Sequence, residues 1–322
     1  MKAILITETG GPEKLALRDV EKPRAAAGQA VVEIKASGVN FIDVYFREGR
    51  YPAALPFVPG QEAAGVVAEV GEGVTTVRVG DRVAWSSVQG TYAEFAAVPA
   101  AALVKLPEGL GFEQGAAAML QGMTAHYLTE SVYPVKKNDV ALVHAAAGGV
   151  GLLLVQMVKR RGGRVVATVS NEAKAELARA AGADEVILYT RDDFAAETRR
   201  LTGGAGVQVV YDGVGKDTFE GSLKSLARRG MMALFGGASG AVPAFDLIRL
   251  SQMGSLFVTR PKLGDYTATR AELEWRAGDV LRWVAAGEVK LRIEHRYPLS
   301  EARRAHEDLQ GRRTTGKLIL VV

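Results

Sequence analysis

A glycine-rich segment over residues 144–151 has the spacing of a phosphate-binding turn. It reads HAAAGGVG and follows the apolar run VALV at 140–143. Glycine lets a backbone turn sharply and approach a phosphate, and free N–H groups at the start of the next helix attract an anion. Gly148 and Gly151 stand at the second and third glycines of the pattern GxGxxG, and Ala146 replaces the first. The segment predicts a nucleotide site if a strand precedes it and a helix follows it.

The residues about 20 positions further on select the nucleotide. Proteins that bind NAD place an acidic residue at the end of the second strand, where it binds the ribose hydroxyls. This chain has Ser170 there, with Lys174 one helical turn beyond. A hydroxyl and an ammonium group suit a 2′-phosphate, so we expect NADPH. The alternatives are that Glu172 is a displaced ribose acid and that Lys174 is an ordinary surface lysine.

Strands and helices alternate around this segment, as a parallel sheet covered on both faces requires. Apolar runs predict strands at 140–144, 164–169, 185–189, 207–211, 231–235 and 255–258. The intervening stretches predict helices at 150–161, 171–181, 192–201, 217–228 and near 245–252. Asn171 is expected to cap the second of these helices.

The two ends of the chain have a different pattern. Short alternating runs at 30–35, 64–70 and 75–79, separated by turns such as Gly80-Asp81, predict a small, strongly bent β domain. An alanine-rich stretch over 112–128 predicts a helix. After residue 260 the strand–helix alternation stops, with a helix expected near 271–286, a segment at 288–297 and a last strand at 317–322. This final part is either a third unit or a return to the first domain.

Composition excludes several classes of protein. The 322 residues include no cysteine, which rules out disulfides and thiolate metal sites. The net charge of +4 comes from scattered lysines and arginines, so nucleic acid is not the expected partner. No run approaches the ~20 apolar residues of a membrane helix. We therefore expect a cytoplasmic protein that does not bind a membrane.

Motifs spread over nearly the whole chain resemble the zinc-free quinone oxidoreductases, the ζ-crystallin-like branch of the medium-chain dehydrogenase/reductase superfamily. The matching stretches are 38–45, 60–65, 80–83, 144–151, 210–215, 258–261 and 314–317. The resemblance implies an α/β fold, in which a Rossmann doubly wound parallel sheet is inserted in a GroES-like, bent β catalytic domain. It implies a catalytic part at 1–122, an NADP-binding domain at 123–260 and a return segment at 261–322. It also implies a homodimer in which strands near 255–258 meet across a two-fold axis.

One motif departs from the zinc-dependent members of this superfamily. They carry Gly-His-Glu-x-x-Gly, whereas this chain has Gln61 in place of the histidine. With no thiolate and no imidazole at this position we expect no metal site, and alcohol dehydrogenase chemistry, which needs a Lewis acid, is not expected. Glu62 is then expected to be a structural acid paired with a buried cation.

The resemblance also assigns the site residues. It implies that Asn40, Tyr45 and Tyr51 are catalytic, lying over the nicotinamide and lining a quinone slot. A tyrosine offers an aromatic face and a hydroxyl donor; the alternative is that the tyrosines pack in the core and Asn40 closes a turn. The implied NADPH contacts are Phe41, Tyr45, Thr124, Gly148, Gly149, Val150, Ser170, Lys174, Tyr189, Phe235, Gly236, Ser239, Val258, Arg260 and Arg312. The methionines and the four histidines receive no role, although His144 is expected to form a local hydrogen bond.

Three functions remain open. The first is NADPH-dependent reduction of quinones, which the resemblance implies to proceed by single electrons and to give a semiquinone. The second is NADPH-dependent reduction of the double bond of an alkenal, enone or enoyl thioester, with Tyr45 or Tyr51 as proton donor. The third is a nucleotide-dependent RNA-binding protein, which the scattered charge disfavours.

Overall fold

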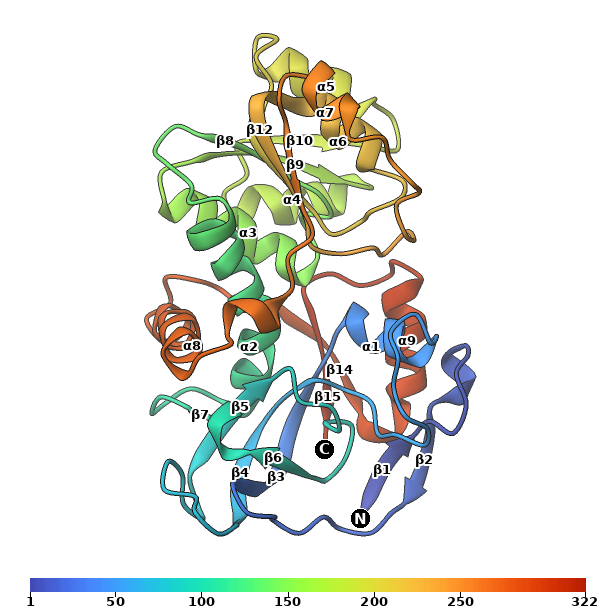
Figure 1. Cartoon of the computed structure of the whole chain (residues 1–322), viewed down its shortest axis with the longest axis vertical. Helices are drawn as coiled ribbons and strands as arrows, with labels where there is room; N and C mark the ends of the chain where they lie inside the picture. Colours follow the sequence, from blue (N-terminus) through green and yellow to red (C-terminus); the bar gives the residue numbers. More distant parts are fainter. The chain divides into compact units, whose positions relative to one another are not determined.

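The computed structural model describes all 322 residues and forms two compact units. Unit 1 consists of Met1–Met123 and Tyr266–Val322, and unit 2 consists of Thr124–Asp265 (Figure 1). The chain therefore leaves unit 1, builds unit 2 and returns to complete unit 1.

Unit 2 is built on a six-stranded parallel sheet in the order β10-β9-β8-β11-β12-β13. Its strands are β8 (Val140–Val143), β9 (Arg164–Val169), β10 (Glu185–Leu188), β11 (Val207–Asp212), β12 (Leu226–Leu234) and β13 (Phe257–Thr259). Numbered from β8, this is the order 3-2-1-4-5-6 of a dinucleotide-binding fold. The strand order reverses at β8, and ligands of such sheets bind outside the carboxyl ends of the strands at this point.

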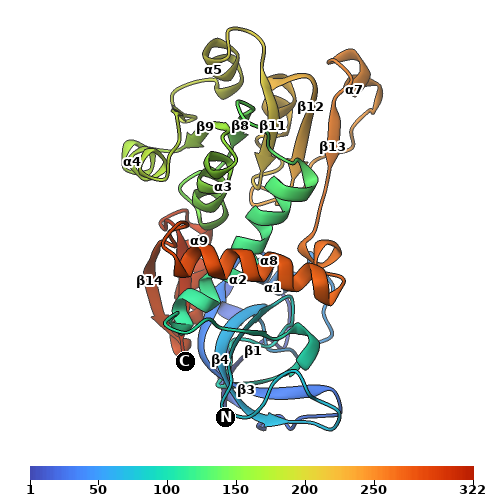
Figure 2. The same ribbon diagram turned by 90° about the vertical axis from the view of Figure 1, so that its left-hand side faces the viewer.

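Helices cover both faces of this sheet (Figure 2). They are α3 (Gly149–Arg160), α4 (Glu172–Ala180), α5 (Phe194–Leu201), α6 (Phe219–Ser225) and α7 (Ile248–Gln252). Helix α3 packs on β8 and β9, whereas α6 packs on β11 and β12. Leu142 faces a core that includes Phe219 and Leu223 of α6. Its neighbours Ala141 and Val143 are fully buried as well, which explains why β8 is apolar at every position.

Unit 1 contains a seven-stranded sheet that joins the two ends of the chain. Its path is β14-β15-β3-β4-β5-β7, and β6 also pairs with β3. The strands are β3 (Gln29–Val39), β4 (Glu62–Val70), β5 (Arg82–Ser86), β6 (Phe95–Pro99), β7 (Val104–Lys105), β14 (Ile293–Pro298) and β15 (Lys317–Val321), and a separate hairpin pairs β1 (Lys2–Leu5) with β2 (Ala16–Asp19). β15 runs antiparallel to β3 with Leu318 opposite Val39. Two register shifts between β3 and β4 bend the sheet around a core that includes Trp85.

Four α-helices belong wholly or mainly to unit 1: α1 (Phe41–Arg47), α2 (Phe112–Tyr127), α8 (Arg270–Ala285) and α9 (Ala302–Gln310). Short 3-10 turns lie at Pro12–Lys14, Ala100–Ala102, Leu263–Tyr266 and Leu299–Glu301, and a π turn, Leu128–Val132, follows α2. A membrane-crossing helix would have to be longer and more apolar than any helix of the structure.

The fold class expected from the sequence is confirmed, with local corrections. Residues 75–79 are not a strand; they lie between turns, with Val77 buried in the core and Val79 60% exposed. The helix expected over 217–228 ends at Ser225, because β12 begins at Leu226. Helices α1 and α9 were not expected. Their apolar faces are short: α9 packs Ala302, Ala305 and Leu309 in the core of unit 1 and adds the buried, hydrogen-bonded His306.

Candidate functional site

A buried ion pair lies where β4 and β15 begin. The Lys317 ammonium donates to Glu62 Oε2, and both side chains are at most 2% exposed. The prediction that Glu62 pairs with a buried cation is confirmed. Gly38 on β3 leaves room for this pair, because a Cβ at that position would lie 2.4 Å from Glu62 Oε2. The backbone N–H of Leu120 donates to the second carboxylate oxygen, Glu62 Oε1, at 2.5 Å.

Asn40 is attached to this ion pair through both ends of its amide. Its Oδ1 accepts from Lys317 Nζ at 2.8 Å and from Gln121 Nε2 at 3.1 Å. Its Nδ2 donates to Glu62 Oε2 at 2.9 Å and to the Gly38 carbonyl at 3.3 Å. The residue is 4% exposed and is the N-cap of α1. Asn40 therefore fixes the start of α1 against the sheet, and its amide is fully hydrogen-bonded within the protein.

Helix α1 carries a cluster of aromatic rings. Tyr45 and Tyr51 meet edge to face with their ring centroids 5.4 Å apart, and Phe41 lies 6.4 Å from Tyr45. The guanidinium of Arg50 lies 5.5 Å from the centre of the Tyr45 ring. The turn that ends the helix places Tyr51 beside Tyr45, since the backbone N–H of Tyr51 donates to the Tyr45 carbonyl at 3.2 Å. The structure thus brings together Tyr45 and Tyr51, which were expected at the substrate, and Phe41, which was expected to contact the cofactor.

A second network of buried polar groups links two residues of α1, Asp43 and Arg47, to Tyr92 and His306. The Arg47 guanidinium donates to His306 Nδ1 at 2.9 Å, and His306 Nε2 is 3.1 Å from the Tyr92 hydroxyl. The Tyr92 hydroxyl donates to Asp43 Oδ2 at 3.0 Å. Asp43 also accepts from the backbone N–H of Asn40 at 2.8 Å, which completes the cap of α1.

Burial shifts the pKa values of three of these hydrogen-bonded side chains. Desolvation raises the pKa of Asp43 to about 7, against hydrogen bonds from Asn40 and Tyr92 that lower it. Desolvation, with the nearby Arg47 charge, lowers the pKa of His306 to about 3. Burial also holds the pKa of Tyr92 well above its ordinary value. The histidine is therefore neutral and the tyrosine remains a donor.

The glycine-rich turn of unit 2 has the geometry of an anion site. It follows β8, and α3 begins at Gly149 with Gly148 as an N-cap that offers no side-chain acceptor. The N–H groups of the first turn of α3 are therefore left for an external partner. A Cβ on Gly151 would lie 2.3 Å from the Ala145 carbonyl oxygen, so only glycine permits this close turn. The residues fit the pyrophosphate of a dinucleotide.

The residues expected at the adenosine end lie at the carboxyl ends of β9 and β10. Ser170 follows β9, and its carbonyl accepts from Thr190 Oγ1 at 2.9 Å. Asn171 caps α4 by accepting from the Lys174 N–H at 3.0 Å, as expected. Tyr189 is 40% exposed directly after β10. Glu172, the alternative ribose acid, is paired with Arg191 at 3.2 Å.

The remaining expected contacts fall into three groups. Phe235, Gly236 and Ser239 lie in the loop after β12, which is bonded to the loop after β11: the Ser239 N–H donates to the Val214 carbonyl at 2.9 Å. Thr124, Val258 and Arg260 also belong to unit 2, at α2 and at β13. Arg312 follows α9 in unit 1 and is exposed.

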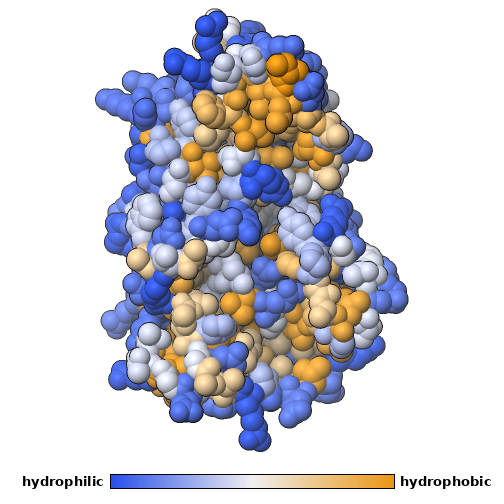
Figure 3. Space-filling view, in the orientation of Figure 1, coloured by the Kyte–Doolittle hydropathy of each residue, from blue (hydrophilic) through white to orange (hydrophobic).

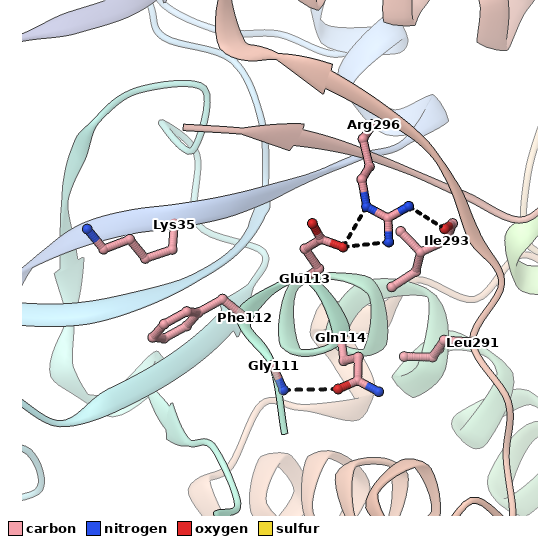
Figure 4. Close-up of a pocket in the computed structure, with 8 residues that line it drawn as sticks. All are labelled: Lys35, Gly111, Phe112, Glu113, Gln114, Leu291, Ile293 and Arg296. Atoms are coloured by element: carbon pink, nitrogen blue, oxygen red, sulfur yellow. Dashed lines mark hydrogen bonds and ion pairs between the residues drawn. The ribbon is translucent and has the colours of Figure 1, made fainter. Parts of the chain in front are cut away.

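A cavity of about 560 Å³ in unit 1 contains none of the expected residues (Figure 4). It is lined by Lys35, Gly111, Phe112, Glu113, Gln114, Leu291, Ile293 and Arg296. Arg296 is paired with Glu113 at 2.8 Å, and Lys35 is paired with Glu33. The charges around this cavity are therefore already balanced.

Sequence reasoning missed the partners that fix the site. Lys317 carried a signal, because a lysine at the start of the apolar run LILVV is an unusual strand residue. Asp43, Tyr92, Arg47 and His306 carried none, because they come from segments up to 263 positions apart whose meeting depends on the fold. No group of three or more His, Cys, Asp or Glu side chains is placed to hold a metal ion.

Comparison with known proteins defines the class. The model of the alcohol dehydrogenase GroES-like domain matches residues 26–108, and that of the zinc-binding dehydrogenases matches residues 149–274. The first match lies in unit 1 and most of the second in unit 2. Together with the sheet order, these matches define a medium-chain dehydrogenase/reductase.

Full-length relatives define the family within this class. The chain is 44% identical over 322 residues to a quinone oxidoreductase of Pseudomonas aeruginosa, with 99% of each chain covered. The structure of Escherichia coli quinone oxidoreductase complexed with NADPH matches with a TM-score of 0.98 at 42% identity and covers 100% of both chains. A 2-haloacrylate reductase of Burkholderia is 41% identical, covering 99% of this chain and 98% of that protein. The chain belongs to the quinone oxidoreductase family.

Proposed function

We propose that this protein is an NADPH-dependent quinone reductase whose unit 1 is the catalytic domain and whose unit 2 holds the cofactor. The observation that carries the proposal is the start of α3 beside the switch point of a 3-2-1-4-5-6 sheet. There Gly148 leaves the helix N-terminus uncapped and Gly151 permits a turn that no larger residue allows. Such a helix start binds the pyrophosphate of a dinucleotide.

Ser170, Lys174 and Tyr189 are proposed to bind the adenosine 2′-phosphate. A hydroxyl and an ammonium group donate to a phosphate, and the exposed ring of Tyr189 offers a face for the adenine. Glu172 is paired with Arg191, which supports the choice of NADPH over NADH. Arg312 is the further cation that the family resemblance assigns to this phosphate.

Bound NADPH supplies the reducing equivalents, so the protein has to orient the acceptor and polarise its oxygens. We assign this role to Tyr45, which is 8% exposed, and to Tyr51, whose rings meet edge to face and each carry a hydroxyl. Asn40 supports them by holding the start of α1, because its own amide is committed to Glu62, Lys317 and Gln121. Its catalytic contribution is therefore proposed to be one of position.

No metal ion takes part in this proposal. Gln61 stands where the zinc-dependent relatives carry histidine, and an uncharged amide is a poor ligand for zinc. We expect quinone reduction to be unchanged after treatment with a chelator and removal of the chelator by dialysis. A loss of activity that added zinc restores would contradict this part of the proposal.

Electrons are proposed to reach the quinone one at a time. Two quinone molecules then each gain one electron, while one NADPH becomes NADP⁺ and one proton is released. The support is the family resemblance, and the test is stoichiometry: two quinones reduced for each NADPH, with a semiquinone signal in electron paramagnetic resonance. One quinone per NADPH and no radical signal would instead indicate hydride transfer.

Reduction of activated alkenes is the second candidate, which the 41% identity to a 2-haloacrylate reductase favours. The two are separated by steady-state assays with 1,4-benzoquinone and 1,2-naphthoquinone against 2-chloroacrylate, an enone and crotonyl thioester. We expect the quinones to give the higher kcat/KM. A higher kcat/KM for any of the alkenes would overturn the choice.

We further propose a cytoplasmic homodimer formed through unit 2. β13 is the last strand of its sheet, so one edge of its backbone has no neighbour. Phe257 on β13 is 55% exposed, and Leu247 and Ile248 at the start of α7 are 72% and 56% exposed. Figure 3 shows apolar surface gathered over the part of unit 2 where Figure 1 places α7. A second copy of the edge strand and of this surface would cover both.

A further inference from the structure

Four buried polar side chains form a continuous chain at the carboxyl ends of β8, β9 and β11. They are Thr168, His144, Ser222 and Asp212, each at most 2% exposed. His144 Nδ1 is 2.8 Å from Thr168 Oγ1, and His144 Nε2 is 3.0 Å from Ser222 Oγ. Ser222 Oγ donates to Asp212 Oδ2 at 2.9 Å.

The hydrogen bonds of this chain all donate in one direction, from Thr168 towards Asp212. The one hydroxyl proton of Ser222 goes to the carboxylate, so its oxygen accepts from His144 Nε2. His144 Nδ1 is then an acceptor and receives the proton of the Thr168 hydroxyl. Burial lowers the pKa of His144, which keeps the ring neutral, and the two hydrogen bonds fix its tautomer. Both ring nitrogens are used, and the edge of Phe194 packs against the ring with the centroids 4.8 Å apart.

Asp212 extends the chain to two loops. Its Oδ1 accepts from the N–H groups of Val214 at 2.8 Å and Gly215 at 3.0 Å, which fixes the turn after β11. Its Oδ2 also accepts from Thr218 Oγ1 at 2.7 Å, before α6 begins. Its backbone carbonyl accepts from the N–H of Phe235 at 2.9 Å, at the end of β12. The Asp212 carboxylate therefore fixes the loop after β11, whereas its backbone carbonyl is bonded to the end of β12.

These contacts lie beside the segments that are proposed to bind the dinucleotide. His144 opens the glycine-rich turn that leads to α3, and Thr168 lies two residues before Ser170. The Asp212 carboxylate fixes Val214, whose backbone carbonyl accepts from the N–H and the hydroxyl of Ser239 in the loop after β12. We propose that the chain Thr168–His144–Ser222–Asp212 positions, without touching the ligand, the three backbone segments that hold the dinucleotide. This inference rests on the proposed function.

A matched pair of substitutions on α6 tests the proposal. Ser222 and Ser225 are both fully buried, and each donates one hydrogen bond. Ser222 donates to Asp212, whereas Ser225 donates to the Gly221 carbonyl within its own helix at 2.8 Å. We expect Ser222→Ala to raise the NADPH dissociation constant about three- to tenfold, and Ser225→Ala to leave it within about twofold, at a similar loss of thermal stability. Equal dissociation constants for the two variants would overturn the proposal.

Fragment binding distinguishes positioning from a general loss of structure. Asp212→Asn, which disturbs the loops of the nicotinamide half, is expected to weaken NADPH and to leave 2′,5′-ADP within about twofold. Thr168→Val, beside the adenosine half, is expected to weaken both ligands by a similar factor, about three- to tenfold. Equal weakening of both ligands by Asp212→Asn would contradict the proposal. Absence of NADPH binding by the unaltered protein would instead refute the proposed function, so the two failures are distinct.

Discussion

At the scale of single residues, the site depends on a charge that is expensive to bury. Lys317 loses its hydration inside the sheet, and only Glu62 and Asn40 compensate for it. Removing one member of a buried pair leaves the other charge without its partner, which costs more than removing both. The ion pair is therefore expected to show strong coupling.

A double-mutant cycle measures this coupling. We expect Lys317→Met and Glu62→Gln each to lower the free energy of unfolding by about 3–5 kcal/mol. The double variant is expected to lose clearly less than the sum of the two, because neither charge is then left alone. Urea unfolding of the four proteins provides the values. Strictly additive losses would show that the two side chains do not depend on each other.

Lys174 is the residue on which cofactor choice is expected to depend. Lys174→Ala removes one donor to the 2′-phosphate and should raise the NADPH dissociation constant about tenfold, because a hydrogen bond to a charged group is worth about 1.5–3 kcal/mol. NADH has no 2′-phosphate, so its dissociation constant should change little. Lys224→Ala, an exposed lysine on α6, is the control. Equal weakening of NADPH and NADH by Lys174→Ala would refute the assignment.

Single residues differ in how much of their role the sequence reveals. Glu62 was expected to have a buried cation because its motif lacks the zinc ligand, yet nothing local identified that cation as Lys317, 255 positions away. His144 was expected to form a local hydrogen bond, whereas its two partners, Thr168 and Ser222, lie 24 and 78 positions along the chain. A motif states which chemistry a residue can perform, whereas partners from distant segments are set by the fold.

At the scale of elements, α1 and α9 are joined by side chains whose pKa values change in opposite directions on folding. Asp43 has an ordinary pKa of 3.8 in the unfolded chain and about 7 in the folded protein. It therefore contributes stability at acid pH that is lost as the pH rises through about 7. His306 has an ordinary pKa of 6.5 and a folded value of about 3, so it contributes stability above pH 6.5 that is lost as the pH falls. Between about pH 4.5 and 6 the two contributions change with pH in opposite directions, so their pH dependences cancel in the free energy of unfolding.

Replacing either Asp43 or His306 should reveal the pH dependence of stability that the other residue causes. In Asp43→Asn only His306 remains, and the free energy of unfolding should fall towards acid by about 1.4 kcal/mol per pH unit relative to the unaltered protein. In His306→Asn only Asp43 remains, and the same free energy should rise towards acid with a similar slope. Urea unfolding between pH 4.5 and 6 measures both. Slopes of the same sign would contradict the assigned protonation states.

The elements themselves were predicted best where their pattern is longest. The strands of unit 2 read as continuous apolar runs because helices cover both faces of the sheet, and β9 has the bounds that the sequence predicts. Helices α1 and α9 escaped prediction because their apolar faces are short and part of their buried surface is polar. A search for apolar periodicity ignores Arg47, Asp43 and His306, which join the two helices. The boundary between α6 and β12 was predicted wrongly for a different reason, because no turn residue marks it at Leu226.

At the scale of the whole molecule, the proposed dimer is tested through Phe257. A charge on an apolar contact surface opposes association, so Phe257→Asp should shift the protein from dimer to monomer in sedimentation velocity. Trp275 on α8 of unit 1, 46% exposed, provides the control, since Trp275→Ala should leave the dimer intact. A monomeric unaltered protein, or a Phe257→Asp variant that remains dimeric, would refute the proposed interface.

The central claim is that unit 2 binds NADPH, with the pyrophosphate at the uncapped start of α3 and the 2′-phosphate at Ser170 and Lys174. A calorimetric titration with NADPH and NADH tests this claim most directly. We predict one NADPH bound per chain, with a dissociation constant at least about tenfold lower than that of NADH. No measurable heat with NADPH, or equal affinity for the two nucleotides, would contradict the account.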